Sequence, residues 1–394
     1  MASHSQVLVE DKSTVRILTL NRPKQMNALC WNMITRLLQL FLAFEEDPRV
    51  KLVILKGQGK AFCAGGDVRP VIRDIVQGKW RLGAGFFSDQ YTLNYVMATY
   101  SKIQISIMNG IVMGGGAGIS IHGRFRIATE KTVFAMPETE LGLFPDVGAS
   151  YFLSRLPGFF GNKIHVFACR QNIEPISFSH PSCLLRLGEY VGLTGARLDG
   201  AEMLACGLAT HFVPSTRLNA LEADLCRLGS SDPVTFSSTI LNAYTQLDVI
   251  DRCISRRTVE DIISTLEREA IQEPDEWILA TIRALKKASP ASLKITLRSV
   301  NKRRTVSGVG QCLIREYRMV CHVMKGELSK DLVEVLSAFL IVYLRSETWE
   351  PRRLEQVTDN MVDQYFKRMD EEEGWKDLKL PPRINLPSSI MSKL

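Results

Sequence analysis

The sequence predicts a mixed α/β fold, because short strands and an amphipathic helix alternate at its start. Apolar runs at residues 7–10 and 15–20 predict two strands, separated by a turn at residues 11–13. Apolar residues at helical spacing predict a helix over residues 27–46, which ends before a proline. The apolar run at residues 52–57 predicts a buried strand, so the order is strand, strand, helix, strand.

Residues 59–68 predict another strand that ends in a glycine-containing loop, in which Asp67 comes directly after two glycines. Residues 70–102 have a largely helical pattern, which we expect to break near Gly83 and Gly85 because glycine weakens helices. This segment carries three aromatic residues at four-residue spacing, which we interpret as a packing stripe: Phe87, Tyr91 and Tyr95.

Residues 109–150 have three adjacent glycines in their first half, and their second half places Glu138 and Asp146 among apolar residues and glycines. Glycine has no side chain, so the backbone N–H groups of such a turn can come within hydrogen-bond reach of a ligand. The same pattern also fits a buried turn with two surface acids. Glu138 follows a proline and suits a helix N-terminus, and Asp146 follows another and suits a plain turn. Spacing alone leaves both interpretations open.

Composition excludes several classes of protein. The 394 residues are 45% hydrophobic and 23% charged, typical of a globular protein with one large domain or two. The net charge of +7 is spread along the chain, which disfavours nucleic-acid binding and suits an anionic small molecule. Nine cysteines without a C-x-x-C pair favour a reducing compartment and no metal site. We expect neither a signal peptide nor a membrane span, since the longest late apolar run is too short.

Several ordered motifs resemble those of the crotonase (enoyl-CoA hydratase/isomerase) superfamily, and within it the plant-like, peroxisomal type of 3-hydroxyisobutyryl-CoA hydrolases. The resemblance covers residues 7–161 and resumes at residue 189. It implies a spiral of strand–strand–helix repeats followed by a helical C-terminal region. The motifs are residues 20–23 (Leu-Asn-Arg-Pro), 26–29 (Met-Asn-Ala-Leu), 61–67 (Ala-Phe-Cys-Ala-Gly-Gly-Asp), 109–116 (Asn-Gly-Ile-Val-Met-Gly-Gly-Gly), 134–139 (Phe-Ala-Met-Pro-Glu-Thr) and 142–148 (Gly-Leu-Phe-Pro-Asp-Val-Gly).

The resemblance implies a catalytic set in which the N–H groups of Gly66 and Gly115 form an oxyanion hole. Glu138 would act as nucleophile or general base, and Asp146 would orient the substrate hydroxyl or the water. Gln90 stands where these hydrolases tend to have a glutamate. Its amide can still form hydrogen bonds but carries no charge, so we expect a different substrate preference. The implied substrate-binding set is Ala64, Gln90, Gly115, Glu138 and Asp146.

The implied reaction is hydrolysis of a short branched 3-hydroxyacyl-CoA thioester, namely 3-hydroxyisobutyryl-CoA to 3-hydroxyisobutyrate and CoA in valine catabolism. No separate cofactor is expected, since coenzyme A belongs to the substrate. Hydratases usually carry a second glutamate where this chain has Gly118, and glycine cannot act as a base, so hydration is disfavoured. Two alternatives remain: an enoyl-CoA hydratase/isomerase-type enzyme, and a non-catalytic CoA-binding or assembly subunit.

The expected organisation is a catalytic core over residues 1–230, helices over 231–375 and an extended polar tail over 376–394. Two segments depart from the resemblance. Residues 162–188 form an insertion with little packing role, and the apolar segment 333–348 is either an aggregation hazard or part of a homo-oligomer interface. The chain ends in Ser392, Lys393 and Leu394, the address read by the peroxisomal import receptor, which predicts a peroxisomal location.

Overall fold

The computed structural model describes residues 5–156, 187–227, 258–272, 276–301, 308–340, 349–369, 375–383 and 386. Most of the predicted insertion, the predicted boundary near residue 230, residues 341–348 and the last three residues lie outside this part of the chain.

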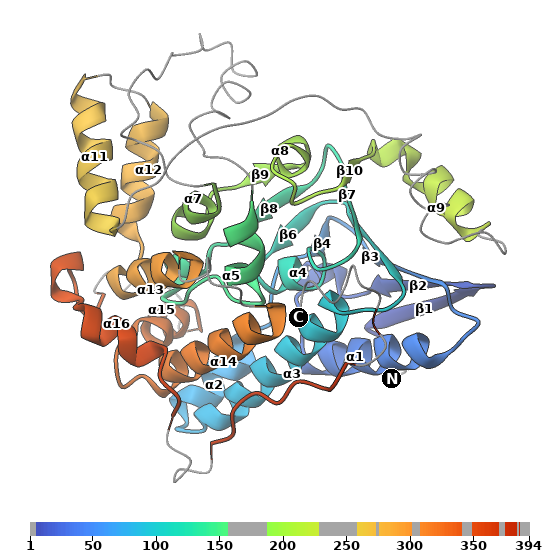
Figure 1. Cartoon of the computed structure of the whole chain (residues 1–394), viewed down its shortest axis with the longest axis horizontal. Coiled ribbons are helices and arrows are strands. Elements are labelled where there is room, and N and C mark those ends of the chain that lie inside the picture. The colour runs from blue at the N-terminus through green and yellow to red at the C-terminus, as the bar shows by residue number, and fades with distance from the viewer. Residues whose placement is uncertain are drawn as a thin grey trace.

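Two sheets share the strands of the core (Figure 1). In the larger sheet the first two strands are antiparallel and all later neighbours are parallel. Its order is β1 (Val7–Lys12), β2 (Val15–Leu20), β3 (Leu52–Gly57), β5 (Ile103–Met108), β7 (Phe125–Ala128) and β10 (His211–Phe212). The smaller sheet has the order β4 (Ala61–Cys63), β6 (Ile111–Met113), β8 (Val133–Ala135) and β9 (Leu198–Asp199).

The chain alternates between the two sheets. The pairs β3 and β4, β5 and β6, and β7 and β8 each place one strand in the larger sheet and the next in the smaller one. Because equivalent strands pair in parallel, each pass lies beside the previous one and the chain advances as a spiral. This confirms the predicted α/β spiral.

Helices surround the sheets. In chain order they are α1 (Trp31–Glu46), α2 (Arg69–Val76), α3 (Trp80–Ala98), α4 (Gly115–Gly118), α5 (Ala149–Phe152), α7 (Leu187–Thr194), α8 (Gly200–Ala205), α9 (Leu218–Cys226), α11 (Val259–Gln272), α12 (Glu276–Lys287), α13 (Pro290–Asn301), α14 (Val309–Lys325), α15 (Asp331–Leu340) and α16 (Asp359–Tyr365). Short 3-10 helices are η1 (Pro23–Gln25), η2 (Glu138–Leu141), η3 (Leu153–Arg155), η5 (Ser215–Arg217) and η7 (Leu354–Gln356). In the described part of the chain, no helix combines the length and apolarity that a bilayer crossing requires.

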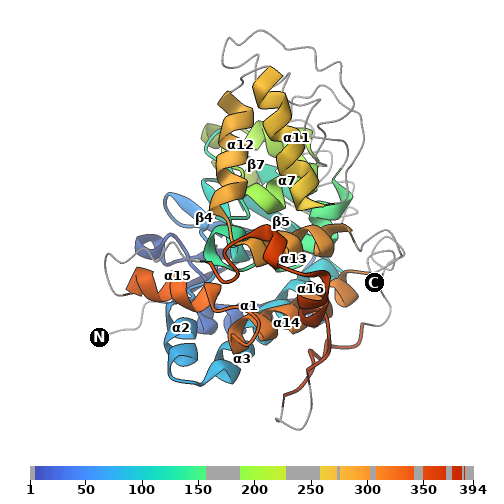
Figure 2. The ribbon, with the colours of Figure 1, turned by 90° about the vertical axis from the view of Figure 1, so that its left-hand side faces the viewer.

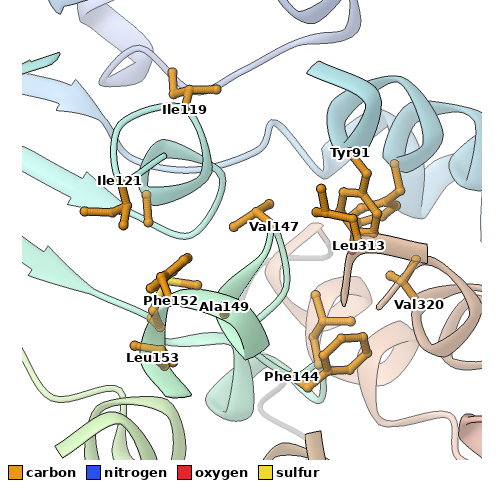
Figure 3. Packing of buried hydrophobic residues seen from close by; sticks show 14 of the residues in the cluster. Tyr91, Ile119, Ile121, Phe144, Val147, Ala149, Phe152, Leu153, Leu313 and Val320 are labelled. Carbon is orange, nitrogen blue, oxygen red and sulfur yellow. The ribbon is translucent and has the colours of Figure 1, made fainter. Parts of the chain in front are cut away.

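The C-terminal helices join the core. Helix α14 packs along α3, while α11 and α12 project away from the sheets (Figures 1 and 2). Figure 3 shows Leu313 of α14 beside Tyr91 of α3, with Val147 nearby, and all three belong to one apolar cluster. Residues on both sides of the predicted domain boundary therefore share a hydrophobic core.

The first predicted helix begins later than expected, at Trp31 rather than residue 27. Asn27 has a φ of +56°, outside the helical region. Its buried side chain instead donates to the carbonyl oxygens of Gln58 and Ala61 and accepts the N–H of Arg22. These tertiary hydrogen bonds hold the loop before the helix against β4.

The predicted break at Gly83 and Gly85 is also wrong, since both residues lie inside α3. The chain breaks instead between α2 and α3, where Gly78 has a φ of +72°. A Cβ atom at Gly83 would lie 2.9 Å from Val71 Cγ1, so this glycine permits close packing of α3 on α2.

The end of the predicted insertion needs correction. Helix α7 is buried from its first residue, Leu187, so the last two residues of the predicted insertion belong to the core. The predicted extended tail has no helix or strand over residues 376–383, and Arg383 joins it to the core through an ion pair with Glu45. Just before the tail, Trp375 stacks on Tyr317.

Candidate active site

The turn between β6 and α4 is built for close approach. Gly114 has a φ of +48°, which side chains rarely adopt, and a Cβ atom there would lie 2.8 Å from Glu138 Oε1. The turn therefore requires glycine both for its backbone conformation and for the carboxyl group above it.

Two loops meet at this turn because β4 and β6 are parallel neighbours, and the segments that follow them leave at the same edge. A Cβ atom at Gly115 would lie 3.1 Å from the backbone nitrogen of Gly66. In the described part of the chain, neither Gly66 nor Gly115 donates its N–H to an acceptor. Gly115 is the first residue of α4, where the N–H has no partner within the helix. Ala64 differs, since its N–H donates to Met26 O at 3.0 Å.

Glu138 is brought to these glycines by η2, which begins at this residue. Its side chain is only 5% exposed, and its Oε2 has no hydrogen-bond partner in the described residues. Burial, followed by the nearby charges of Asp146 and Glu316, raises the pKa of the Glu138 carboxyl well above its ordinary value. A solvent-facing acid placed for the helix dipole would not be buried over Gly114, so the surface interpretation is wrong.

Asp146 is buried as well, although its backbone does make a turn in which its carbonyl oxygen accepts the N–H of Ala149. Its carboxylate accepts a 2.7 Å hydrogen bond from the Tyr91 hydroxyl. Burial raises the pKa of Asp146 to about 7, against the lowering effect of the Tyr91 hydrogen bond, and the charge of Glu316 adds to the rise. The packing interpretation of Tyr91 is therefore incomplete, because its hydroxyl holds a site carboxylate.

Gln90 reaches the same turn from α3. It is 2% exposed, and its Nε2 would lie 2.6 Å from a Cβ atom at Gly115. Its Oε1 has no hydrogen-bond partner among the described residues. The structure thus brings Gln90, Gly66, Gly115, Glu138 and Asp146 together, as the sequence predicts.

Glu316 is a site residue that the sequence reasoning missed. It extends from α14, is fully buried, and accepts the N–H groups of Gly148 at 2.6 Å and Ser150 at 2.9 Å. It also accepts the Ser150 hydroxyl. An acid within the apolar stripe of Leu313, Tyr317 and Val320 is the signal that could have identified it.

The loop held by Glu316 carries backbone strain. Val147 has a φ of +57°, which is unfavourable for a β-branched residue, and its carbonyl oxygen lies 2.9 Å from His122 Nε2. A Cβ atom at Gly118 would lie 2.6 Å from Val147 Cβ. The place that a side chain at residue 118 would take is therefore already filled by this loop.

The arrangement suits a reaction that builds negative charge on a carbonyl oxygen. Two backbone N–H groups without acceptors lie beside a buried carboxyl group, with a second carboxyl group behind it. Among the residues described, no group of three or more His, Cys, Asp or Glu side chains could hold a metal ion.

Comparison with known proteins identifies the family of the chain. The family model described as enoyl-CoA hydratase/isomerase matches residues 15–170 and 175–366. A protein of Arabidopsis thaliana named "Probable 3-hydroxyisobutyryl-CoA hydrolase 3" is 70% identical, over 98% of this chain and 98% of its own. Another from the same plant, named "Small ribosomal subunit protein mS47", is 40% identical over 95% of this chain and 88% of its own.

Solved structures agree as well. The crystal structure of a carnitinyl-CoA dehydratase from Mycobacterium thermoresistibile is 30% identical, with a TM-score of 0.78 over 96% of this chain and 100% of its own. Its fold is thus similar over nearly the whole length. The matched family and this shared fold establish that the chain belongs to the enoyl-CoA hydratase/isomerase family of the crotonase superfamily.

Proposed function

We propose that the protein hydrolyses a short branched 3-hydroxyacyl-CoA, with 3-hydroxyisobutyryl-CoA as the preferred substrate. The observation that carries the proposal is the Glu138 carboxyl group directly above the glycine turn, beside the free N–H groups of Gly66 and Gly115. The name of the 70% identical relative supports this choice of substrate. Such a reaction would be the hydrolytic step of valine catabolism.

In this proposal the thioester oxygen accepts hydrogen bonds from Gly66 and Gly115. Attack on the carbonyl carbon moves charge onto that oxygen, and each donor of such a pair lowers the barrier by about 3 kcal/mol. Because the two donors are backbone groups in a packed turn, they keep their orientation without reorganising during the reaction.

Two routes then use Glu138. As a nucleophile, its carboxylate forms a mixed anhydride with the acyl group and releases the thiolate of coenzyme A, after which water cleaves the anhydride and restores the carboxylate. As a general base, it takes a proton from water, which attacks the thioester carbonyl carbon; the tetrahedral intermediate then expels the thiolate of coenzyme A, and the proton returns from Glu138 to that thiolate. Asp146, oriented by Tyr91, positions the water in both routes.

The hydratase alternative is weaker because the chain has no side chain at Gly118, and Val147 occupies the space that one would need. An assembly role is the other alternative, and it is motivated by the ribosomal name of the 40% identical relative. Buried carboxyl groups with raised pKa values are costly to keep in a purely structural protein, which favours a reaction.

The test is a panel of CoA esters in which release of free thiol and loss of the enoyl double bond are measured separately. We expect thiol release from 3-hydroxyisobutyryl-CoA and little turnover of methacrylyl-CoA. Hydration of methacrylyl-CoA without thiol release would favour the hydratase, and binding of CoA esters without turnover would favour the assembly role.

We also propose a peroxisomal location, supported by the terminal Ser392, Lys393 and Leu394. Removing Leu394 from a protein with a fluorescent domain at its N-terminus should leave the fusion outside peroxisomes, since the receptor reads the free terminal tripeptide. The unshortened fusion is the control. Peroxisomal fluorescence of the shortened fusion would contradict the proposal.

A further inference from the structure

A second amide side chain lies along the glycine turn. Asn94 follows Gln90 by four residues on α3 and is fully buried. Both of its polar side-chain atoms, Oδ1 and Nδ2, lack a hydrogen-bond partner in the part of the chain that the structure describes. An amide buried in this way costs about 1–3 kcal/mol for each unsatisfied group, so its presence calls for a ligand or a water molecule.

Gln90 lies beside the first residue of the short helix α4, and Asn94 lies beside its last residue. A Cβ atom at Gly118 would lie 2.9 Å from Asn94 Nδ2, and one at Gly115 would lie 2.6 Å from Gln90 Nε2. Residues four apart on α3 lie on one helix face, about 6 Å apart along its axis. The side-chain amides of Gln90 and Asn94 therefore lie along α4, one beside Gly115 with its free N–H and the other beside Gly118.

We propose that Asn94 binds the 3-hydroxyl group of the acyl chain and so selects hydroxylated substrates. This inference rests on the proposed function, which places the thioester oxygen at Gly115. The hydroxyl-bearing carbon is two bonds beyond the thioester carbon, and in this proposal it lies on the Asn94 side of the turn. A hydroxyl group both donates and accepts a hydrogen bond, and the Asn94 amide offers one acceptor and a donor that are otherwise unused.

The neutral amide suits this place better than an acid. Glu138, Asp146 and Glu316 are already buried here; the charges of Asp146 and Glu316 raise the pKa of Glu138, and that of Glu316 raises the pKa of Asp146. A further negative charge would raise these pKa values again. Asn94 can recognise a hydroxyl group without adding that charge.

The experiment compares 3-hydroxyisobutyryl-CoA with isobutyryl-CoA, which has the same carbon skeleton without the hydroxyl group. The wild-type protein should prefer the hydroxylated ester in kcat/KM by about 30-fold or more, because a buried amide left unpaired penalises the deoxy substrate. In Asn94→Leu, which keeps a similar volume, kcat/KM should fall about 10- to 100-fold for the hydroxylated ester and less than about 3-fold for isobutyryl-CoA.

Two further variants separate recognition from structure. Asn94→Asp retains an acceptor and should keep more of the preference than Asn94→Leu. Thr92→Val is the matched control, since the Thr92 hydroxyl donates to Ser88 O within the same helix and should not affect the preference. An equal fall on both esters in Asn94→Leu would overturn the inference, because it would assign Asn94 to structure or to a bound water.

A wild-type protein that does not distinguish the two esters would also overturn it, even if Asn94→Leu fails to fold. Binding of both esters to Glu138→Gln, measured by calorimetry, gives the same comparison without turnover. If the wild type binds the hydroxylated ester more tightly but releases no thiol, the proposed function fails while the recognition of the hydroxyl group stands.

Discussion

Glu138→Gln is expected to lower kcat for thiol release by about 10³-fold or more, because glutamine can act neither as nucleophile nor as general base. The same change should also stabilise the fold at pH values above the ordinary pKa of a carboxyl group. The folded-state pKa of Glu138 is raised, so the stability that this group contributes is complete below its unfolded pKa and is lost as the pH rises towards the folded value. Glutamine carries no charge and avoids that loss.

Denaturant unfolding at pH 5 and pH 8 would measure this effect. We expect the variant to exceed the wild type by about 1–3 kcal/mol at pH 8 and by less at pH 5. Glu140→Gln is the matched control, since Glu140 lies two residues further along η2 but is exposed, and pairs with Lys287. Equal rates for the wild type and Glu138→Gln would remove Glu138 from the reaction.

Glu316→Ala should lower the free energy of unfolding by about 3–5 kcal/mol, because it leaves the buried N–H groups of Gly148 and Ser150 without an acceptor. The turn that carries Asp146 and the strained Val147 would then lose its support from α14. We therefore expect kcat/KM to fall together with stability.

Urea titration and thiol release on the same samples would test both effects. Glu316→Gln should be intermediate, since its side-chain oxygen can still accept one of these hydrogen bonds. Glu327→Ala, an exposed acid that pairs with Lys325 just beyond α14, should change little. A Glu316→Ala protein as stable and active as the wild type would contradict the role assigned to Glu316.

The sequence predicts those parts of the site that are local in the chain. Glu138 and Asp146 lie within one glycine-rich stretch, and the two strand exits that carry Gly66 and Gly115 are visible as apolar runs followed by glycines. Tyr91 and Glu316 are different. Tyr91 is 55 residues from Asp146, and Glu316 is 168 residues from Gly148. Their roles depend on which helices pack together, which no local pattern specifies.

The errors in secondary structure have the same origin. Glycine propensity predicts a break at Gly83, but the packing of α3 on α2 stabilises a continuous helix through it. The sequence predicts an extended polar tail but not its partner, because Arg383 pairs with Glu45, which is 338 residues away in the chain. In each case the missing information is a tertiary contact.

The most direct test of the hydrolytic centre is the pH dependence of kcat/KM for thiol release, in the wild type and in Asp146→Asn. Because burial and neighbouring charge raise the pKa of Glu138, and that of Asp146 to about 7, activity should rise with pH well above the ordinary carboxylate range. Asp146→Asn removes one of these charges, so the remaining activity should rise at a lower pH than in the wild type. A profile that is flat from about pH 5 to pH 8, or an identical midpoint in both proteins, would contradict the assignment of the buried carboxyl pair as the centre of the reaction.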